Sequence, residues 1–342
     1  MFTKAKPASL PPAALASELF SLPDALLLYV RKSKRAHSAL SLAKHFQIDI
    51  ATLKLAIDTI VSWGYDLKRQ NDAVQFAEAP DLLSATEIQF GLKTKIMGTQ
   101  VHAYRSLKST NDLAADLAEH GAPEGTVVTS EEQTRGRGRL GRTWHSPGGT
   151  GIYISFILRP SVAPERAPGI SVLTALALAD TLVKRFPKGV QIKWPNDVLV
   201  SGRKVAGILT ELNAERGRIN YVIVGVGINA NQKRDDFPEE LRDRATSLRV
   251  ACRHAVNRPE LLREFLHQFE KEYFVYQKEG LARSHGRLKK YSSLLGQEVT
   301  LDSGGHRIHG KAVDITADGG LVLDCSGERR VVSAGEVTVV KK

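Results

Sequence analysis

The sequence predicts an α+β fold in three parts: an N-terminal helical module, a central mixed α/β region and a small C-terminal β domain. Three observations predict it. The first 80 residues contain three short segments with apolar residues at helical spacing. Between residues 81 and 293, strand-like runs alternate with long helical patterns. From residue 294 onward, short strand-like runs are separated by glycines, as in small β-barrels.

The composition is that of an ordinary globular protein with a basic surface. The chain has 342 residues, 42% of them apolar and 25% charged, which leaves room for two or three domains. Its formal net charge of +11 indicates an anionic partner, whether nucleotide, nucleic acid or acidic protein. The sequence has no long apolar run, so we expect no membrane partner. Its two cysteines, Cys252 and Cys325, build no disulfide framework, and we therefore expect a cytoplasmic location.

The N-terminal part, residues 1–80, combines helical and strand patterns. Residues 1–22 are rich in proline and predict a loose leader without a secretory signal. Asp49 is the expected N-cap of the third helix and Gly64 its expected end. Helices are predicted at 24–35, 39–46 and 50–63, and two short strands at 65–67 and 73–76. This order of elements matches a winged helix-turn-helix.

DNA binding does not follow from that outline. The basic run from Arg31 to Arg35 predicts phosphate contacts, which carry no sequence information. The recognition helix would open with Ile50-Ala-Thr-Leu-Lys54, which lacks the Arg, Asn and Gln side chains that read base edges. A small helical module that binds no DNA therefore stays open as an alternative.

The central part, residues 81–293, follows a predicted linker at 79–84. A short helix after Leu113, ended by Gly121, follows Ser109-Thr-Asn111, whose side chains are first interpreted as helix caps. A helix start with free N–H groups and hydroxyls is also suited to a polar ligand. Strands are predicted at 101–104, 152–158 and 222–229, long helices at 170–186 and 258–280, and a hairpin at 190–212 that turns at Ser201-Gly202.

The C-terminal part, residues 294–342, predicts a separate β domain. Its strand-like runs are short and divided by glycines, which indicates a small barrel of the SH3 type. The runs are 299–301, 310–315, 321–323, 330–332 and 337–340.

Arginine and glycine alternate in the segment Gly136-Arg-Gly-Arg-Leu-Gly-Arg-Thr-Trp144. Glycine lets a backbone approach a ligand closely, and in an extended segment Arg137 and Arg139 project to the same side. Fixed positive charge on such a loop suits a polyphosphate whose charge must be held while a bond breaks. A solvated or nucleic-acid-binding segment is the alternative. The dinucleotide pattern Gly-x-Gly-x-x-Gly is rejected because prolines and glycines follow it instead of a helix.

The hairpin carries a cation in an apolar setting. Alternation along the strand predicts that Lys204 shares a face with Ala206 and Ile208. A lysine on an apolar face needs an anionic partner or must extend its ammonium group outward to water. Further along, Gly225 and Gly227 remove side chains from a strand, which indicates that something packs against its backbone.

Taken together, the Arg-Gly segment and the motif Lys193-Trp-Pro-Asn-Asp197, followed by Arg203-Lys-Val-Ala-Gly-Ile-Leu209, resemble biotin–protein ligases of the bacterial BirA family. Ser109-Thr-Asn111 and Gly225-Val-Gly-Ile-Asn229 lie where that family has their counterparts. The resemblance covers residues 100–340 well and the N-terminal part in outline only. It implies a central catalytic domain with a class II synthetase-like fold.

The resemblance also implies an activity and a site. Such enzymes use ATP and Mg²⁺ to convert biotin to biotinyl-5′-AMP and then transfer biotin to a lysine of a biotin carboxyl carrier protein of acetyl-CoA carboxylase. Operator DNA and a homodimer are further partners that the resemblance allows, and no metal ligands are assigned. The implied catalytic residues are Arg137, Arg139 and Lys204; the implied biotin site consists of Ser109, Thr110, Asn111, Gln133, Arg137, Gly138, Arg139, Lys204, Gly225 and Gly227; the implied nucleotide residues are Arg139, Arg142, Lys193, Asn196 and Asn229.

Two other functions compete with this one. Lipoate or octanoyl ligases and transferases resemble the same catalytic fold, although the Arg-Gly segment and the appended barrel favour biotin. A DNA-binding regulator whose large domain only senses a ligand would fit the N-terminal helices, but it leaves the Arg-Gly segment unexplained.

Overall fold

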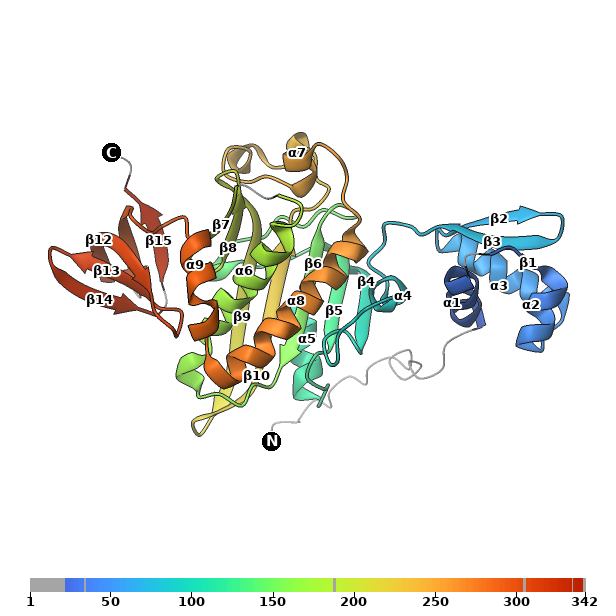
Figure 1. Ribbon diagram of the computed structural model, residues 1–342, viewed down its shortest axis with the longest axis horizontal. Helices are drawn as coiled ribbons and strands as arrows, with labels where there is room; N and C mark the ends of the chain where they lie inside the picture. The colour runs from blue at the N-terminus through green and yellow to red at the C-terminus, as the bar shows by residue number, and fades with distance from the viewer. Residues whose placement is uncertain (1–21, 34, 187–188, 304–305, 334, 341–342) are drawn as a thin grey trace, which may run out of the picture. The chain divides into compact units, whose positions relative to one another are not determined.

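The computed structural model describes residues 22–33, 35–186, 189–303, 306–333 and 335–340. These residues divide into two compact units, one ending at Pro80 and the other beginning at Asp81 (Figure 1). The predicted leader lies outside the described residues up to position 21, and Leu22 already belongs to the first helix.

The first unit packs three helices against a small antiparallel sheet with strand order β1-β3-β2. Thr52 N donates to Asp49 Oδ1 at 2.7 Å, so the predicted N-cap of the third helix is confirmed. Leu27, Leu53 and Ile60 are fully buried in its core. The elements are α1 Leu22–Ser33, β1 His37–Ser38, α2 Ala39–Phe46, α3 Ile50–Ser62, β2 Asp66–Gln70 and β3 Ala73–Glu78. Strand β1 was missed because two residues are too few to show an alternating pattern.

The second unit is built on a seven-stranded mixed sheet with order β4-β5-β6-β10-β9-β8-β7. Only β4 and β5 run parallel; the other neighbours are antiparallel. The strands are β4 Val101–Leu107, β5 Val127–Gln133, β6 Ile152–Leu158, β7 Val190–Lys193, β8 Asp197–Val200, β9 Arg203–Glu215 and β10 Arg218–Ile228. The Ser201-Gly202 turn has positive φ at both residues (52° and 78°), so the predicted hairpin is confirmed between β8 and β9.

Helices lie on both faces of this sheet, and β6 and most of β10, at its centre, are buried on two sides. Helices α6 (Pro168–Leu182) and α8 (Arg258–Glu279) pack on one face (Figure 1). There Phe156 contacts Phe265 and Phe269. Helix α5 packs on the other face over Val128, Ile157 and Ile223. The helices are α4 Ala85–Gln89, α5 Thr110–Glu119, α6 Pro168–Leu182, α7 Leu248–Cys252, α8 Arg258–Glu279 and α9 His285–Tyr291. None of the described helices combines the length and the apolar character needed to cross a bilayer.

The C-terminal strands form a five-stranded antiparallel sheet with order β14-β13-β12-β11-β15. Each predicted run lies within one strand, apart from Val340, which follows the last. Leu301, Ala312 and Leu323 are fully buried and join the main core. The strands are β11 Glu298–Ser303, β12 His306–Ile315, β13 Leu321–Cys325, β14 Glu328–Val332 and β15 Glu336–Val339.

A buried arginine ties the start of the second unit to the sheet. Arg258 is 1% exposed and donates from Nε to Asp81 Oδ2 at 2.9 Å and from Nη1 to Glu131 Oε2 at 2.8 Å. Glu131 Oε1 also accepts from Leu83 N at 2.7 Å. Residues 81–83 are therefore anchored structure, and the predicted linker 79–84 was wrong over this stretch because such long-range pairing leaves no local pattern.

Candidate active site

A pocket of about 470 Å³ lies on the sheet face that carries α5. Its lining comes from the start of α5, the end of β5, the Arg-Gly segment, the residue before β8, and parts of β6, β9 and the end of β10. The lining residues are Ser109, Thr110, Asn111, Gln133, Arg137, Gly138, Arg139, Trp144, Ile154, Asn196, Lys204, Gly207, Ile208, Leu209, Gly225, Val226 and Gly227.

The pocket floor is made of glycine because side chains from elsewhere occupy the space above it. A Cβ on Gly225 would come within 2.1 Å of Asn111 Oδ1. A Cβ on Gly227 would come within 2.4 Å of Trp144 Nε1, and one on Gly207 within 3.0 Å of Trp144 Cζ3. The prediction that something packs against this backbone is confirmed: the amide of Asn111 and the indole of Trp144 do so.

The start of α5 presents its polar side chains to the pocket. Ser109 occupies the N-cap position, yet its side chain makes no capping bond within the described chain. Gln133 Oε1 accepts the Thr110 N–H instead, at 2.9 Å. Helix capping was therefore the wrong interpretation of Ser109, because a side chain distant in sequence performs that role. All three residues, Ser109, Thr110 and Asn111, line the pocket.

The Arg-Gly segment folds into a narrow turn over the pocket and is not an extended strand. Trp144 N donates to Gly136 O at 2.9 Å and Gly138 N to Arg142 O at 2.7 Å. Between these bonds a 3₁₀ turn spans Arg139–Gly141, with Leu140 at φ 57°. The backbone reverses directly after Gly138, so the side-by-side arrangement predicted for Arg137 and Arg139 does not occur.

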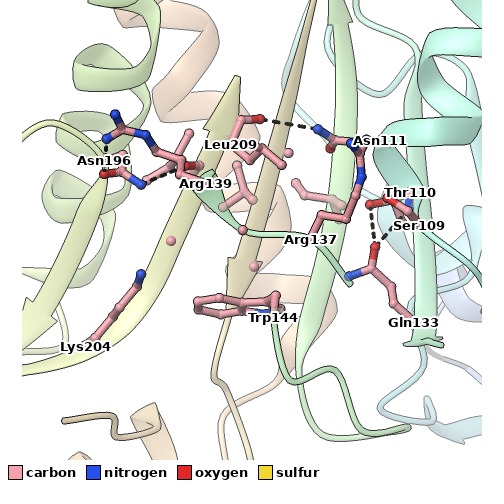
Figure 2. Close-up of a pocket in the computed structure, with 17 residues that line it drawn as sticks. Ser109, Thr110, Asn111, Gln133, Arg137, Arg139, Trp144, Asn196, Lys204 and Leu209 are labelled. Atoms are coloured by element: carbon pink, nitrogen blue, oxygen red, sulfur yellow. Dashed lines mark hydrogen bonds between the residues drawn. The ribbon is translucent and has the colours of Figure 1, made fainter. Parts of the chain in front are cut away.

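The two arginines reach opposite ends of the pocket (Figure 2). Arg137 pairs with Asp112 Oδ1 at 2.6 Å and Glu211 Oε1 at 3.0 Å, close to Asn111. Arg139 donates to Asn196 Oδ1 at 2.9 Å and to a backbone carbonyl, Gly335 O, at 3.1 Å. Burial lowers the pKa of the Arg139 guanidinium, although the group stays a cation. The charge of Arg137 is matched by two carboxylates, whereas Arg139 forms no close ion pair within the described chain.

Lys204 also points into the pocket, which corrects the face predicted for it. Leu199 pairs with Lys204, but Val198 pairs with Ala206, so Val205 is an extra residue in β9. This β-bulge reverses the alternation, and Ala206 and Ile208 lie in the core while Lys204 lies beside Gly207 on the opposite face. Periodicity could not show this because a bulge changes the count without changing the residue types.

At this end of the pocket, Lys204 is held between an anion and a ring. Its Nζ lies 2.7 Å from Asp197 Oδ1 and 5.3 Å from the centre of the Trp144 ring. The Lys204 side chain is about one-third exposed, so the ammonium can exchange Asp197 for another anion. Trp144 Nε1 is buried and has no hydrogen-bond partner among the described residues, which leaves it a donor for a ligand.

The pocket therefore combines two kinds of chemistry. One end offers neutral hydrogen-bonding groups from Thr110, Asn111 and Gln133, and the other offers the cations Lys204 and Arg139 (Figure 2). The arrangement suits a molecule with a polar, uncharged head and an acidic tail whose charge, together with that of a polyphosphate, is stabilised by cations.

Most but not all predicted site residues meet here. Arg142 pairs with Glu336, Asn229 Nδ2 donates to Thr246 O at 3.1 Å, and Lys193 ends β7. These three do not line the pocket, and their assignment to a nucleotide stays a prediction. The lining residues not assigned from the sequence are Trp144, Ile154, Gly207, Ile208, Leu209 and Val226. Trp144 and Gly207 stand inside the motifs that carry the resemblance, and that position was the available signal.

Two protein-family models match the chain. The Biotin/lipoate A/B protein ligase family matches residues 103–229, which include most of the pocket. The Biotin protein ligase C terminal domain matches residues 294–340, the five-stranded sheet. The pocket and this sheet thus define the class of protein: a ligase that attaches an acid cofactor to another protein.

Relatives and solved structures agree with these matches. The chain is 37% identical over 280 residues to a bifunctional ligase/repressor BirA of Bacillus subtilis, covering 81% of this chain and 86% of the relative. It is 35% identical over 237 residues to a biotin–[acetyl-CoA-carboxylase] ligase of Mycobacterium tuberculosis, covering 67% and 85%. A biotin protein ligase from Aquifex aeolicus, in complex with biotin and ATP, superposes with a TM-score of 0.62 at 29% identity, covering 71% and 100%. The chain belongs to the biotin/lipoate A/B protein ligase family.

Proposed function

We propose that the protein is a biotin–protein ligase that uses ATP. In the first step a biotin carboxylate oxygen attacks the α-phosphorus of ATP, forming biotinyl-5′-AMP and releasing pyrophosphate. In the second, the amine of an acceptor lysine attacks the acyl carbon, AMP leaves, and the amine loses a proton. The acceptor is a biotin carboxyl carrier protein. The observation that carries the proposal is the two-ended pocket, with amide and hydroxyl groups at one end and Lys204 and Arg139 at the other.

The residues at the two ends of the pocket have different roles. Thr110, Asn111 and Gln133 hold the uncharged ring of biotin at the α5 end. Lys204 and Arg139 lie where carboxylate and phosphate charge meet, and their positive charge stabilises the transition state as that charge shifts between oxygens. The Arg-Gly turn covers the mixed anhydride and shields it from water. No side chain has to act as a nucleophile in this sequence of steps.

We further propose that Mg²⁺ accompanies the nucleotide. The described residues contain no group of three or more His, Cys, Asp or Glu side chains able to hold a metal. Mg²⁺ commonly binds through one carboxylate, several waters and the phosphates themselves. Asp197, beside Lys204, is the carboxylate nearest the cationic end that fits this description. Bound there, the metal would neutralise phosphate charge.

Hydrogen bonding at the α5 end favours biotin over lipoate or octanoate. The cyclic urea of biotin has N–H donors and a carbonyl acceptor to match Thr110 and Asn111, which are buried, and Gln133, which is half-buried. A dithiolane or an alkyl chain would make no use of the hydrogen-bonding capacity that these side chains keep beyond their bonds within the protein, and would gain nothing from it.

Exchange of radiolabelled pyrophosphate into ATP tests the function directly. We expect exchange that depends on biotin and is absent with lipoate, octanoate or no acid. Biotin must then be transferred to a carrier domain in the presence of ATP. Exchange with lipoate but not biotin would assign the chain to the other branch of its family, and ligand binding without exchange would leave it a sensor.

We also propose finer features of the two small domains. Residues 1–80 form a winged helix-turn-helix domain, residues 81–293 the catalytic domain and residues 294–342 an SH3-like barrel. Support for the first comes from α2 and α3 followed by the β2–β3 hairpin. Support for the last comes from five short antiparallel strands. Cytoplasmic location and a homodimer, the usual requirement for a two-fold operator, belong to the same proposal.

A repressor role is the second candidate, because the Bacillus subtilis relative is named a ligase/repressor. We expect only weak and strongly salt-dependent DNA binding by this chain. The exposed face of α3 presents Ile50, Lys54, Leu55 and Asp58, and Asp58 is paired with Arg69 at 2.8 Å. Such a face reads few base edges, so phosphate contacts would dominate and weaken steeply with salt.

A titration of the full-length protein tests this expectation. The protein, with biotin and ATP, is titrated against its own upstream DNA and against a scrambled duplex of equal length. We expect similar affinities that fall together between low and physiological salt. A preference of more than about a thousandfold, typical of specific operators, would contradict the expectation and establish the repressor.

A further inference from the structure

A buried serine beneath the pocket joins two of the lining residues. Ser155 lies on β6, is 0% exposed and pairs across the sheet with Gly225. Its Oγ lies 2.7 Å from Thr110 Oγ1 and 2.5 Å from Asn111 Oδ1. The missing Cβ of Gly225 lets Asn111 Oδ1 reach this place. Ser155 itself is not among the residues that line the pocket.

The direction of the hydrogen bonds through Ser155 is fixed at the Asn111 end. Asn111 Nδ2 donates to Glu211 Oε2 at 2.6 Å, and a carboxylate can only accept. The oxygen of the Asn111 amide must therefore face Ser155, which donates its single proton to it. Ser155 Oγ then accepts the proton of the Thr110 hydroxyl, since two oxygens at 2.7 Å need a proton between them.

The series of hydrogen bonds continues from Thr110 to Gln133 at the end of β5. Thr110 Oγ1 also lies 3.1 Å from Gln133 Oε1, but its contact with Ser155 Oγ is shorter, at 2.7 Å, so its proton goes to Ser155. Gln133 Oε1 takes its hydrogen bond from the Thr110 backbone N–H at 2.9 Å. Gln133 Nε2 donates in turn to Ser146 Oγ at 3.1 Å, and Ser146 donates to Trp144 O at 3.0 Å. Thr110 Oγ1 is left with a lone pair for the pocket and no proton to give. Each hydrogen bond in the series that joins Glu211 to Trp144 thus has a defined donor and a defined acceptor.

We propose that Ser155 is a positioning residue that sets the ligand specificity of this pocket. By taking the Thr110 proton, it makes Thr110 a hydrogen-bond acceptor and so selects a ligand head that carries N–H donors. On the proposed function, on which this inference rests, that head is the cyclic urea of biotin. Ser155 acts through Thr110 and Asn111, and Glu211 fixes the direction from the surface end.

Steady-state kinetics of pyrophosphate exchange tests the assignment in the full-length protein. In Ser155→Ala, we expect the KM for biotin to rise about tenfold, as for loss of one or two neutral hydrogen bonds. The KM for ATP and kcat should stay within about twofold, because binding of the head is equal in ground and transition states. Ser284→Ala is the matched control. Ser284 is a buried serine that donates to Glu272 Oε2 at 2.9 Å, outside the pocket, and its loss should change neither KM.

A second ligand separates orientation from general loosening of the fold. The probe is a cyclic carbamate analogue of biotin in which oxygen replaces one ureido N–H. The parental protein should discriminate against the isomer that loses the Thr110 contact, and Ser155→Ala should lose most of that discrimination. A purely structural role would weaken both ligands equally and leave their ratio unchanged.

Glu211 tests the direction without touching the core, since its side chain is 37% exposed. In Glu211→Gln only the long contact of Asn111 Nδ2 with Leu209 O, at 3.5 Å, still fixes which side of the Asn111 amide faces Ser155, so the KM for biotin should rise. Asp112→Asn is its matched control, because Asp112 shares Arg137 with Glu211 but does not bond Asn111. We expect the Glu211 variant to show the larger rise in KM and the larger loss of carbamate discrimination.

The outcomes distinguish a failure of the proposed function from a failure of the role assigned to Ser155. If the parental protein catalyses no biotin-dependent exchange, the proposed function fails and this assignment fails with it. If the parental protein is active but Ser155→Ala and Glu211→Gln keep its biotin KM and its ligand ratio, the assignment alone is wrong. Should Ser155→Ala not fold, the Glu211 and Asp112 pair decides the question.

Discussion

Lys204→Met should fold and lose the adenylation step, with kcat for biotin-dependent pyrophosphate exchange lower by about 10²–10³-fold, as when one preorganised donor is removed from a developing charge. Methionine keeps the unbranched stem beside Gly207 and Trp144 but removes the ammonium that lies 2.7 Å from Asp197. The carboxylate of biotin and the α-phosphate would then meet without a cation between them. The measurement is the exchange rate at saturating biotin and ATP.

The control is an equivalent ion pair elsewhere. Lys289 pairs with Asp314 at 3.1 Å on the surface, so Lys289→Met should leave exchange unchanged. Because Lys204→Met leaves the mostly buried Asp197 without its partner, the double variant with Asp197→Asn separates a loss of stability from a loss of chemistry. Parental exchange by the single variant would show that Lys204 is an ordinary surface lysine.

Arg139→Ala should release the adenylate intermediate. The Arg139 guanidinium lies in the Arg-Gly turn and reaches Asn196 and Gly335 O from above the cationic end of the pocket. Loss of one charge-assisted hydrogen bond corresponds to about 1.5–3 kcal/mol, or about 10- to 150-fold faster dissociation of biotinyl-5′-AMP. Free adenylate should accumulate in solution when no acceptor protein is present.

Dissociation is followed by trapping adenylate released from a preformed complex. Arg218→Ala, at the exposed opposite end of β10, removes a comparable charge and should leave the dissociation rate as it was. An Arg139 variant that retains the intermediate as long as the parental protein would rule out a clamping role for this side chain.

Much of the fold followed from local patterns. A short, nearly continuous apolar run placed β6, which is buried on both faces, and apolar residues at helical spacing placed α3 and α8. Asp49 and Gly64 marked the ends of α3 through short-range capping and positive φ. Two predictions failed for different reasons. Strand β1 is too short to show a pattern, and Asp81 is anchored by Arg258, 177 residues away.

The candidate site divides in the same way. The glycines and arginines of the Arg-Gly segment were conspicuous in the sequence. That they share a site with Lys204 was predicted from the family resemblance alone. The opposite reach of Arg137 and Arg139 could not be predicted, because it depends on Asp112, Glu211 and Asn196 as partners. Ser155 gave no signal at all, since a single serine in an apolar strand looks like an ordinary core residue.

The bulge at Val205 has a consequence for sequence comparison and design. Because side chains alternate with a period of two, the extra residue Val205 puts Lys204 and Ala206 on opposite faces of β9 although they stand two positions apart. In this hairpin the number of residues between two positions decides which face of the strand each side chain occupies, independently of the residue types.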